Sequence, residues 1–282
     1  MTRASIDNQH STKASVLPLG EDDPDFVRAL ARGLAVLECF QDAADGLTLS
    51  AVAERTGLTR GSARRLLLTL EFLDYIGAND RRFFLRPRAM RLGQAYLASQ
   101  PLWSRAQQLL EDLVTQTNHA SSLGLLEGGE ALYVARAVPK RLIDNDIPVG
   151  TKIPAYANSM GKILLAHMSK EDLDNYLRNV TLKKHTPHTI SSKTELRRDL
   201  AAARERGWSF SDEEVQLGLQ ALAVPIMNLD GQPVAALNIT RYTSTANSDT
   251  LEQYVPIVQR TAAEISKLVF WHPQFRFPAA RR

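Results

Sequence analysis

The 282-residue sequence lacks the marks of a disulfide-rich, membrane-spanning or metal-binding protein. It has one cysteine, Cys39, so no disulfide can form within the chain, as is typical of proteins from a reducing compartment. No run of about 18 apolar residues occurs, so we expect no membrane partner. The N-terminus lacks an apolar signal core, which favours a cytoplasmic protein. Histidine, cysteine and acidic residues nowhere have metal-ligand spacing, and we expect neither a metal nor another cofactor.

Lysine is absent from residues 26–100, although this stretch contains eleven arginines and seven acidic residues. The whole chain has a formal net charge of only +3, so its basic excess lies at this end. Arginine can form two parallel hydrogen bonds to a phosphate or a guanine, whereas lysine acts as a point charge. The composition therefore favours a nucleic-acid-binding surface in the N-terminal third of the chain.

Residues 49–76, LSAVAERTGLTRGSARRLLLTLEFLDYI, have the pattern of a helix-turn-helix. Val52 and Ala53 begin an apolar face, Gly57 can take the positive φ of a tight turn, and Thr59 can cap a second helix. The second helix is basic on its outward face, and we expect it to enter the major groove of DNA. The candidate DNA-binding residues on this helix are Thr59, Arg60, Ser62, Arg64, Arg65 and Thr69.

A two-stranded ribbon is predicted directly after this recognition helix. Tyr75 and Ile76 begin an extended segment, Asn79-Asp80 makes a turn, and Arg82–Leu85 returns as a second strand. Such a ribbon is the wing of a winged helix-turn-helix. We expect Arg82 on the wing to contact the DNA backbone or its minor groove.

An amphipathic helix from Asp25 to about Ala44 precedes the helix-turn-helix. Its apolar positions are predicted to pack under the other two helices and complete the domain. These positions are Ala29, Leu30, Leu34, Leu37 and Phe40. The predicted organisation is a disordered tail (1–25), a winged domain (26–87), linker helices (88–118), an effector-binding domain (119–271) and a C-terminal tail (272–282).

After about residue 119, predicted strands and helices alternate without a glycine-rich phosphate loop. The expected strands cover residues 122–126, 131–138, 208–210, 220–227 and 233–241, with an irregular edge segment at 147–153. The expected helices cover residues 159–168, 170–178, 193–207 and 248–270, the last one interrupted or bent near Pro256. This order favours a mixed sheet flanked by helices, as in small-molecule sensor domains. The whole chain is therefore predicted to be an α+β protein.

Several separate motifs, in this order, resemble those of IclR-type transcriptional regulators. They are GLTRGSARRLLLTLEFLDYI, FFLRPRAMRLGQAYL, PAYANSMGKILLA, TPHTI, GWSFSDEEVQLGLQALAVPI and GQPVAALNITR. The resemblance covers about residues 26–270. It implies a winged N-terminal domain, a linker helix and a GAF-like α/β effector domain. It also implies a homodimer, often joined into a tetramer, that binds two-fold related half-sites on operator DNA.

The sequence segments RRLLLTL and LAVPI…AALN further resemble the branch of this family that controls aromatic-acid catabolism. Regulators of that branch respond to protocatechuate, 4-hydroxybenzoate or β-ketoadipate-pathway compounds as effectors. The resemblance thus implies a regulator of catabolic genes that senses a small organic acid.

The resemblance also implies an effector site in the C-terminal domain, formed by Ser159, Met160, Ser211, Ala221, Asn238 and Thr240. Free N–H groups at the start of the helix that begins at Ser159 suit a ligand carboxylate. Asn238 and Thr240 alternate on one strand and so share a face, for which a solvent-facing sheet edge is the alternative. Members that answer to small keto acids often have Asp in place of Ser211 and Cys in place of Ala221. This chain therefore leaves room for a larger ligand.

Other functions stay open at this point. One is a regulator that senses keto acids. Another is an enzyme, but Ser159, His167 and Asp212 lack nucleophile-elbow spacing, so we expect no catalytic residue. The run Asp212-Glu213-Glu214 is interpreted as a solvated turn or a helix cap. A third is a protein-interaction module with a winged fold that only dimerises, which the arginine excess disfavours.

Overall fold

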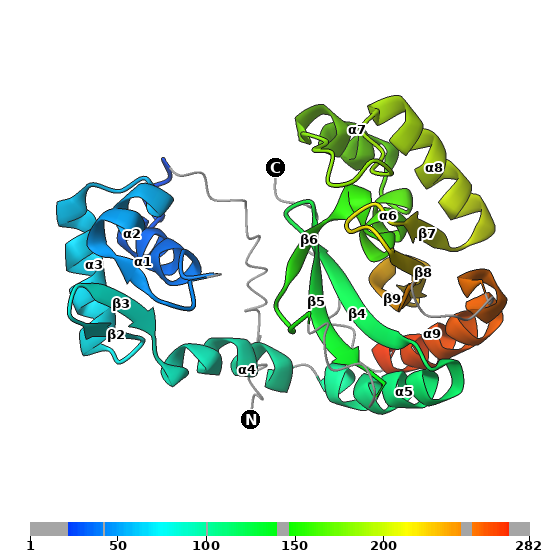
Figure 1. Cartoon of the computed structure of the whole chain (residues 1–282), viewed down its shortest axis with the longest axis horizontal. Coiled ribbons are helices and arrows are strands. Elements are labelled where there is room, and N and C mark those ends of the chain that lie inside the picture. Colours follow the sequence, from blue (N-terminus) through cyan, green and yellow to red (C-terminus); the bar gives the residue numbers. More distant parts are fainter. Residues whose placement is uncertain (1–21, 42, 100, 140–146, 244–249, 271–282) are drawn as a thin grey trace, which may run out of the picture. The chain divides into compact units, whose positions relative to one another are not determined.

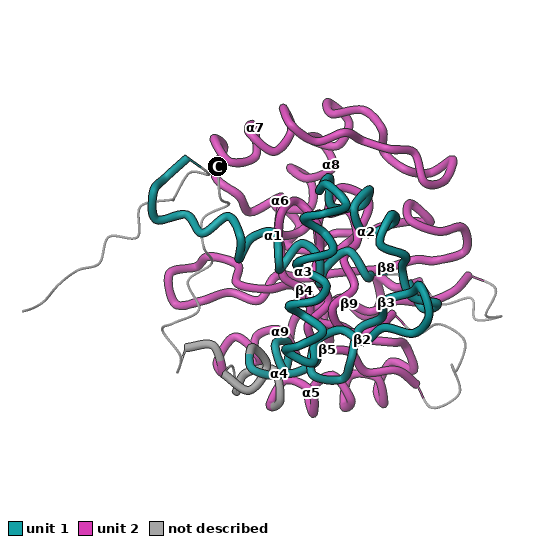
Figure 2. Tube along the Cα trace, turned by 90° about the vertical axis from the view of Figure 1, so that its left-hand side faces the viewer, with its two compact units in different colours: residues 1–96 teal, residues 97–282 magenta. Residues whose placement is uncertain are grey.

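The computed structural model describes residues 22–41, 43–99, 101–139, 147–243 and 250–270. The chain forms two compact units, residues 1–96 and 97–282 (Figure 2). The division falls inside the predicted linker of residues 88–118. The predicted tails lie outside the described residues, apart from residues 22–25.

The first unit contains three helices and a small antiparallel sheet. Its elements are α1 (Arg28–Glu38), β1 (Leu47–Thr48), α2 (Leu49–Thr56), α3 (Arg60–Phe72), β2 (Ile76–Asn79) and β3 (Arg82–Leu85) (Figure 1). The strands lie in the order β1-β3-β2. Val36, Val52 and Leu67 are fully buried in one apolar core that joins the three helices. The predicted wing is present, and β1, which the sequence analysis does not predict, adds a third strand to it.

The turn between α2 and α3 forms as the sequence predicts. Gly57 ends α2 in the left-handed conformation, with φ of 66°, which costs glycine less than any other residue. The Thr59 hydroxyl then caps α3 by accepting a hydrogen bond of 3.3 Å from the Ser62 N–H. These two local features fix the direction in which α3 leaves the turn.

The first helix is shorter than the periodicity predicts. α1 begins at Arg28 and ends at Glu38, well before Ala44. Just beyond its end, the Arg55 guanidinium donates hydrogen bonds to the carbonyls of Cys39 (2.9 Å) and Gln41 (3.2 Å). The Arg55 side chain thus replaces the backbone N–H donors that another helical turn would supply to these carbonyls. The helix can therefore end here.

The apolar stripe of α1 is not all in the core. Val36 and Phe40 are buried, but Leu30 is 62% exposed, Leu34 is 46% exposed and Ala29 is also exposed. The prediction that Ala29, Leu30 and Leu34 pack under the other helices is wrong. The rest of the first unit covers only the side of α1 that carries Val36, and the predicted apolar stripe is wider than that side.

Between the wing and the second unit's sheet, the chain is helical. A short 3-10 turn (η1, Pro87–Ala89) leads into α4 (Met90–Ser99), followed by α5 (Pro101–Thr117). Pro87 and Pro101 each stand at the start of their helical segment, where the missing N–H costs nothing. None of the helices within the described residues is both long and apolar enough to cross a bilayer.

The second unit is built on a six-stranded antiparallel sheet. The strands are β4 (Ala120–Glu127), β5 (Glu130–Ala137), β6 (Lys152–Pro154), β7 (Ser209–Asp212), β8 (Leu219–Met227) and β9 (Pro233–Tyr242). They lie in the order β6-β5-β4-β9-β8-β7, so the last strand of the chain occupies the middle of the sheet. The expected irregular edge segment, residues 147–153, overlaps the edge strand β6.

Helices cover both faces of this sheet (Figure 1). The remaining helical elements are η2 (Ala155–Ala157), α6 (Ser159–Ala166), α7 (Lys170–Asn179), α8 (Lys193–Arg206), η3 (Leu251–Tyr254) and α9 (Val255–Phe270). α5 and α9 pack on one face over a core that includes Leu123, Val224 and Leu237. α6 packs on the other face, and α8 packs on α6. The predicted break near Pro256 is present, because the 3-10 turn gives way to α9 at Val255.

Candidate DNA-binding surface and effector site

The outward face of α3 carries three arginines that have no ion-pair or hydrogen-bond partner in the described part of the chain. Arg60, Arg64 and Arg65 are exposed, and no ion pair or side-chain hydrogen bond to the described residues engages their guanidinium groups. An uncompensated basic helix face is the electrostatic pattern of a DNA-binding surface. The structure therefore leaves these side chains available to phosphates and base edges.

The hydroxyl groups predicted to contact DNA have partners within the helix. Thr59 caps α3 and also donates a hydrogen bond of 3.1 Å to the Ser62 hydroxyl. Thr69 donates a hydrogen bond of 2.9 Å to the Arg65 carbonyl. These residues thus set the shape of α3, and each hydroxyl still has a lone pair or proton to offer.

The predicted wing residue Arg82 is exposed, but its guanidinium is engaged. Its Nη1 donates a hydrogen bond of 2.9 Å to the Gly46 carbonyl, which ties β3 to the turn before β1. Arg86 is paired with Asp74. The neighbouring Arg81, at the tip of the wing, is exposed as well.

Four of the six predicted effector residues lie on the sheet beneath α6, and the other two, Ser159 and Met160, begin that helix. Ser211 on β7, Ala221 on β8 and Thr240 on β9 are directly paired neighbours, and neighbouring residues in register share a face. A second row beside this one crosses five strands through Ser209, Ala223, Asn238, Ser122 and Arg136. The alternative of a solvent-facing edge is wrong, because β9 is a central strand and both Asn238 and Thr240 are buried.

α6 lies closely over these two rows. Ser159 and Met160 at its start are fully buried, and a Cβ on Gly124 of β4 would lie 2.8 Å from the Met160 sulfur. The Ser209 hydroxyl donates a hydrogen bond of 2.6 Å to the Ser159 carbonyl, and Ser211 donates one of 2.9 Å to the carbonyl of Ala157. These bonds anchor the start of α6 to the sheet.

The centre of this region holds buried polar groups without partners. Among the described residues, neither amide atom of Asn238 has a hydrogen-bond partner of good geometry, although its side chain interacts with the Tyr133 hydroxyl, and the hydroxyl of Ser159 has no partner. Leaving one such group unsatisfied costs about 1–3 kcal/mol. Buried polar atoms of this kind indicate a place where another molecule supplies the missing hydrogen bonds.

Tyr133, Asn158, Ser122 and Arg136 belong to the same region and are not among the predicted site residues. Asn158, which caps α6, donates a hydrogen bond of 3.1 Å to the Tyr133 hydroxyl. Arg136 Nη1 donates one of 3.1 Å to the Ser122 hydroxyl. Strand register brings Ser122 and Arg136 to Asn238, and the packing of the start of α6 brings Asn158 to Tyr133, and no spacing in the sequence indicates either.

Burial raises the pKa of Tyr133, while the hydrogen bond from Asn158 and the positive charge of Arg136 oppose this rise. The phenol therefore stays protonated at neutral pH and can donate a hydrogen bond. The two rows contain no acidic side chain, and Arg136 gives them a positive charge. This arrangement suits a small anion with further polar groups.

A buried ion cluster lies on the same helix, one turn after Ser159. The fully buried Lys162 ammonium is hydrogen bonded to the Glu214 carboxylate and lies 2.9 Å from Asp199 Oδ2. The interpretation of Glu214 as part of a solvated turn is therefore wrong. Burial raises its pKa, while the Lys162 charge opposes the rise. The pairing joins residues 52 positions apart, which local patterns cannot predict.

The residues considered for an enzyme do not form a catalytic constellation. Ser159 begins α6 and His167 follows its last residue, so about 12 Å of helix separates them. The His167 ring contacts the Ile163 carbonyl at 2.8 Å, and Asp212 accepts a hydrogen bond from Gln220. In the described part of the chain, no three potential metal ligands come together either.

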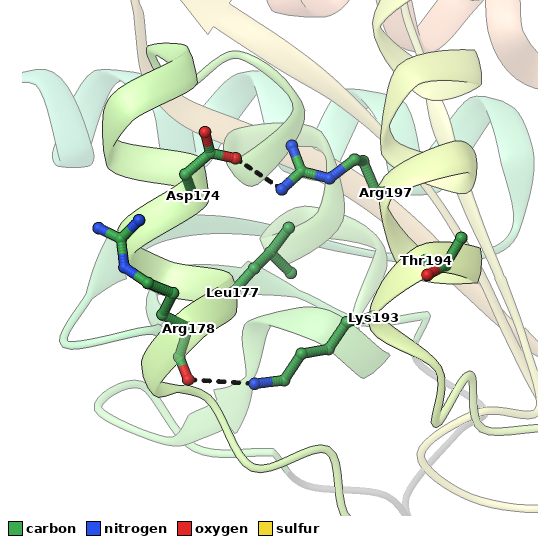
Figure 3. A pocket seen from close by; sticks show the side chains of 6 residues that line it. All are labelled: Asp174, Leu177, Arg178, Lys193, Thr194 and Arg197. Atoms are coloured by element: carbon green, nitrogen blue, oxygen red, sulfur yellow. Dashed lines mark hydrogen bonds and ion pairs between the residues drawn. The ribbon is translucent and has the colours of Figure 1, made fainter.

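A separate groove runs between α7 and α8 (Figure 3). Arg197 in it pairs with Asp174 at 2.6 Å, and Lys193 donates a hydrogen bond of 3.1 Å to the Arg178 carbonyl. Arg197 and Lys193 thus already have partners within the groove, and none of the predicted effector residues lines it. The polar rows under α6 are the stronger candidate for the effector site.

Two family models match most of the chain. Residues 29–79 match the IclR helix-turn-helix domain, and residues 94–267 match the bacterial transcriptional regulator IclR C-terminal domain. These matches coincide with the wing-bearing first unit and with the sheet-based second unit. Both families are families of transcriptional regulators rather than enzymes.

Relatives with known roles are similar over nearly the whole chain. The Pca regulon regulatory protein of Pseudomonas putida is 39% identical over 88% of this chain and 86% of its own length. The p-hydroxybenzoate hydroxylase transcriptional activator of Acinetobacter baylyi is 37% identical over 87% of this chain and 93% of its own. The solved structure of an IclR homologue from Microbacterium hydrocarbonoxydans, in complex with 4-hydroxybenzoate, is 25% identical, covers 85% of this chain and 98% of its own, and has a TM-score of 0.72. The chain therefore belongs to the IclR family of DNA-binding transcriptional regulators.

Proposed function

We propose that this protein controls genes of aromatic-acid catabolism and responds to an aromatic acid bound under α6. The observation that carries the proposal is the buried polar region around Asn238, where polar groups such as the Ser159 hydroxyl are unsatisfied and the two described sheet rows contain Arg136 and no acidic side chain. The aromatic-acid pathways named for the relatives support the ligand class. Acting on operator DNA, the protein would work beside the chromosome in the cytoplasm.

In this proposal the ligand divides its polar groups between two parts of the site. The carboxylate binds Arg136 and the Ser122 hydroxyl, since charge-assisted bonds to a guanidinium are the strongest that the rows offer. A ring hydroxyl binds Tyr133 or Asn238 near the start of α6. The small Ala221 leaves space for the ring, and Ser159, Met160, Ser211 and Thr240 complete the site.

The ligand class is tested by thermal unfolding of the purified protein in the presence of single compounds. The panel consists of protocatechuate, 4-hydroxybenzoate, β-ketoadipate, cis,cis-muconate, pyruvate and glyoxylate. A ligand at one hundred times its Kd stabilises the folded state by about 2.7 kcal/mol, which is a clear shift in Tm. A shift with an aromatic or β-ketoadipate-pathway acid supports the proposal. A shift with pyruvate or glyoxylate alone would favour the keto-acid alternative.

Arg136→Gln is expected to weaken binding of the responsive acid by about 10- to 150-fold, because one charge-assisted hydrogen bond is lost. Isothermal titration of the parent and the variant measures this change. Arg197→Gln, in the groove of Figure 3, removes the same charge elsewhere and should leave the affinity unchanged. Equal affinities of the parent and Arg136→Gln would show that the carboxylate binds somewhere else.

We propose that the exposed stripe of α1 pairs with a second copy of the chain. Val27, Leu30 and Leu34 lie on one side of the helix and are all exposed. Apolar patches of this kind mark association surfaces. A two-fold dimer would present two copies of α3 to two half-sites of an operator.

The double variant Leu30→Glu/Leu34→Glu is expected to be monomeric at micromolar concentration, since four charges would face one another in the dimer. Light scattering on a sizing column measures the mass. Leu229→Glu, on an exposed turn of the second unit, is the matched control and should keep the mass of the parent. An unchanged mass for the double variant would move the dimer contact away from α1.

Ligand binding would then be transmitted through the helices that connect the wing to the sheet of the second unit along the chain. A ligand changes DNA affinity only through its different affinities for two arrangements of the protein. We place the winged domain at residues 26–87, the linker at 88–118 and the effector domain at 119–271. In this scheme α4 and α5 pass a shift in the effector domain to the spacing of the two recognition helices.

A further inference from the structure

The outward face of α3 is not wholly polar. Leu68 is 43% exposed and Phe72, one turn further along the helix, is 88% exposed. The opposite face of α3 supplies the buried Ala63, Leu67 and Leu70 to the core. Leu68 and Phe72 therefore form an exposed apolar strip that lies outside the described core of their own domain.

This strip lies beside the free arginines. Leu68 follows Arg64 by four positions and Arg65 by three, and such residues are surface neighbours on a helix. An apolar partner protein would have to desolvate these uncompensated charges to reach Leu68. A DNA duplex instead supplies phosphates for the arginines, so charge complementarity favours DNA as the molecule that covers the strip.

The major groove has one apolar feature that such a strip could recognise. Thymine carries a C5-methyl group at the groove floor, and apolar side chains distinguish thymine from other bases by contact with it. We propose that Leu68 reads a thymine methyl group in the operator and that Phe72 extends this contact to a neighbouring step. The inference rests on the role of α3 in DNA binding and adds to it a sequence-selective contact made without a hydrogen bond.

Uracil-substituted DNA tests this contact directly, because uracil differs from thymine only by the missing methyl group. The probe is the duplex that the full-length parent protein enriches from a random pool, with each thymine of a half-site replaced in turn by uracil. We expect the parent to lose affinity by about four-fold at one or two positions, which is the contribution of one buried methyl group. Leu68→Ala should bind thymine and uracil equally at one of these positions.

Two further variants complete the design. Phe72→Ala should remove the uracil penalty at a different position from Leu68→Ala. Leu217→Ala removes an exposed leucine from the second unit and should keep the full penalty at every position. Because Leu68 and Phe72 are exposed, neither replacement leaves a cavity.

The inference is overturned if the parent binds the uracil duplexes as tightly as the thymine duplex, or if Leu68→Ala keeps every penalty. In both cases the proposed function stands, since DNA binding itself is intact. A drop in the mass of Leu68→Ala or Phe72→Ala without DNA would show that a second copy of the chain covers the strip, which also overturns it. Failure of the parent to enrich any duplex would overturn the proposed function as well.

Discussion

Replacing Lys162 with methionine is expected to lower the free energy of unfolding of the second unit by about 3–5 kcal/mol, the usual cost of breaking a buried ion pair. The ammonium is fully buried against Glu214 and Asp199, so its loss leaves carboxylates without a counter-charge. All three tryptophans lie between residues 103 and 271, within the second unit. Urea unfolding followed by tryptophan fluorescence therefore reports on this unit alone.

An exposed ion pair is the matched control for this variant. Lys152 pairs with Glu127 at 2.8 Å, and both side chains are well exposed, so Lys152→Met should cost no more than about 1 kcal/mol. The double variant Lys162→Met/Glu214→Leu should recover much of the loss, since it removes the stranded charge. A cost below about 1 kcal/mol for Lys162→Met would show that water reaches the cluster and replaces the lysine.

The same variant has a pH dependence with a definite sign. Burial raises the pKa of Glu214 above its unfolded value, and the Lys162 charge opposes this rise. In the variant that opposing charge is absent, so the pKa of Glu214 rises further. A carboxyl with a raised pKa in the folded state stabilises the fold at acidic pH, and this stability is lost as the pH rises through that pKa. The deficit of Lys162→Met relative to the parent should therefore shrink on acidification.

Arg64→Ala and Arg65→Ala are each expected to weaken operator binding by about 5- to 150-fold, which corresponds to about 1–3 kcal/mol per base contact. The two guanidinium groups are exposed on α3 and have no partner among the described residues. Fluorescence anisotropy with the enriched duplex at a fixed salt concentration measures the loss. If an arginine contacts only phosphate, its variant instead weakens binding to all sequences and lowers the salt dependence.

Arg197→Ala serves as the control, since it removes one positive charge from the second unit, far along the chain from α3. Its affinity for the duplex should match that of the parent. If both α3 variants also bind like the parent, then α3 does not enter the groove. The winged domain would then serve association alone, as in the interaction-module alternative.

Local sequence patterns predict the winged domain well. The positive φ of Gly57, the Thr59 cap and the turn at Asn79-Asp80 each depend on residues close together in the chain. Periodicity also predicts the apolar stripe of α1, but it does not tell whether the same chain or a second copy covers that stripe. This is why Leu30 and Leu34 are assigned wrongly to the core.

The effector site is predictable only in part, because its residues meet through strand register. Ser211, Ala221 and Thr240 can be chosen from the resemblance to IclR regulators, and the sheet indeed pairs them. Arg136 and Ser122 come to Asn238 from two other strands, and nothing in their own surroundings in the sequence marks them. The ion pair of Lys162 and Glu214 is equally hard to predict, because the sequence of a buried lysine–glutamate pair does not differ from that of an exposed one.

The central position of β9 has a consequence for how the protein is made on the ribosome. Synthesis runs from the N-terminus, so the compact first unit can fold while the rest is still being translated. The sheet of the second unit cannot close until Pro233–Tyr242 has been added between β4 and β8. A message cut short before that strand would encode the arginine face of α3 without Asn238, and by the proposed effector site we expect its product to bind DNA without a response to a metabolite.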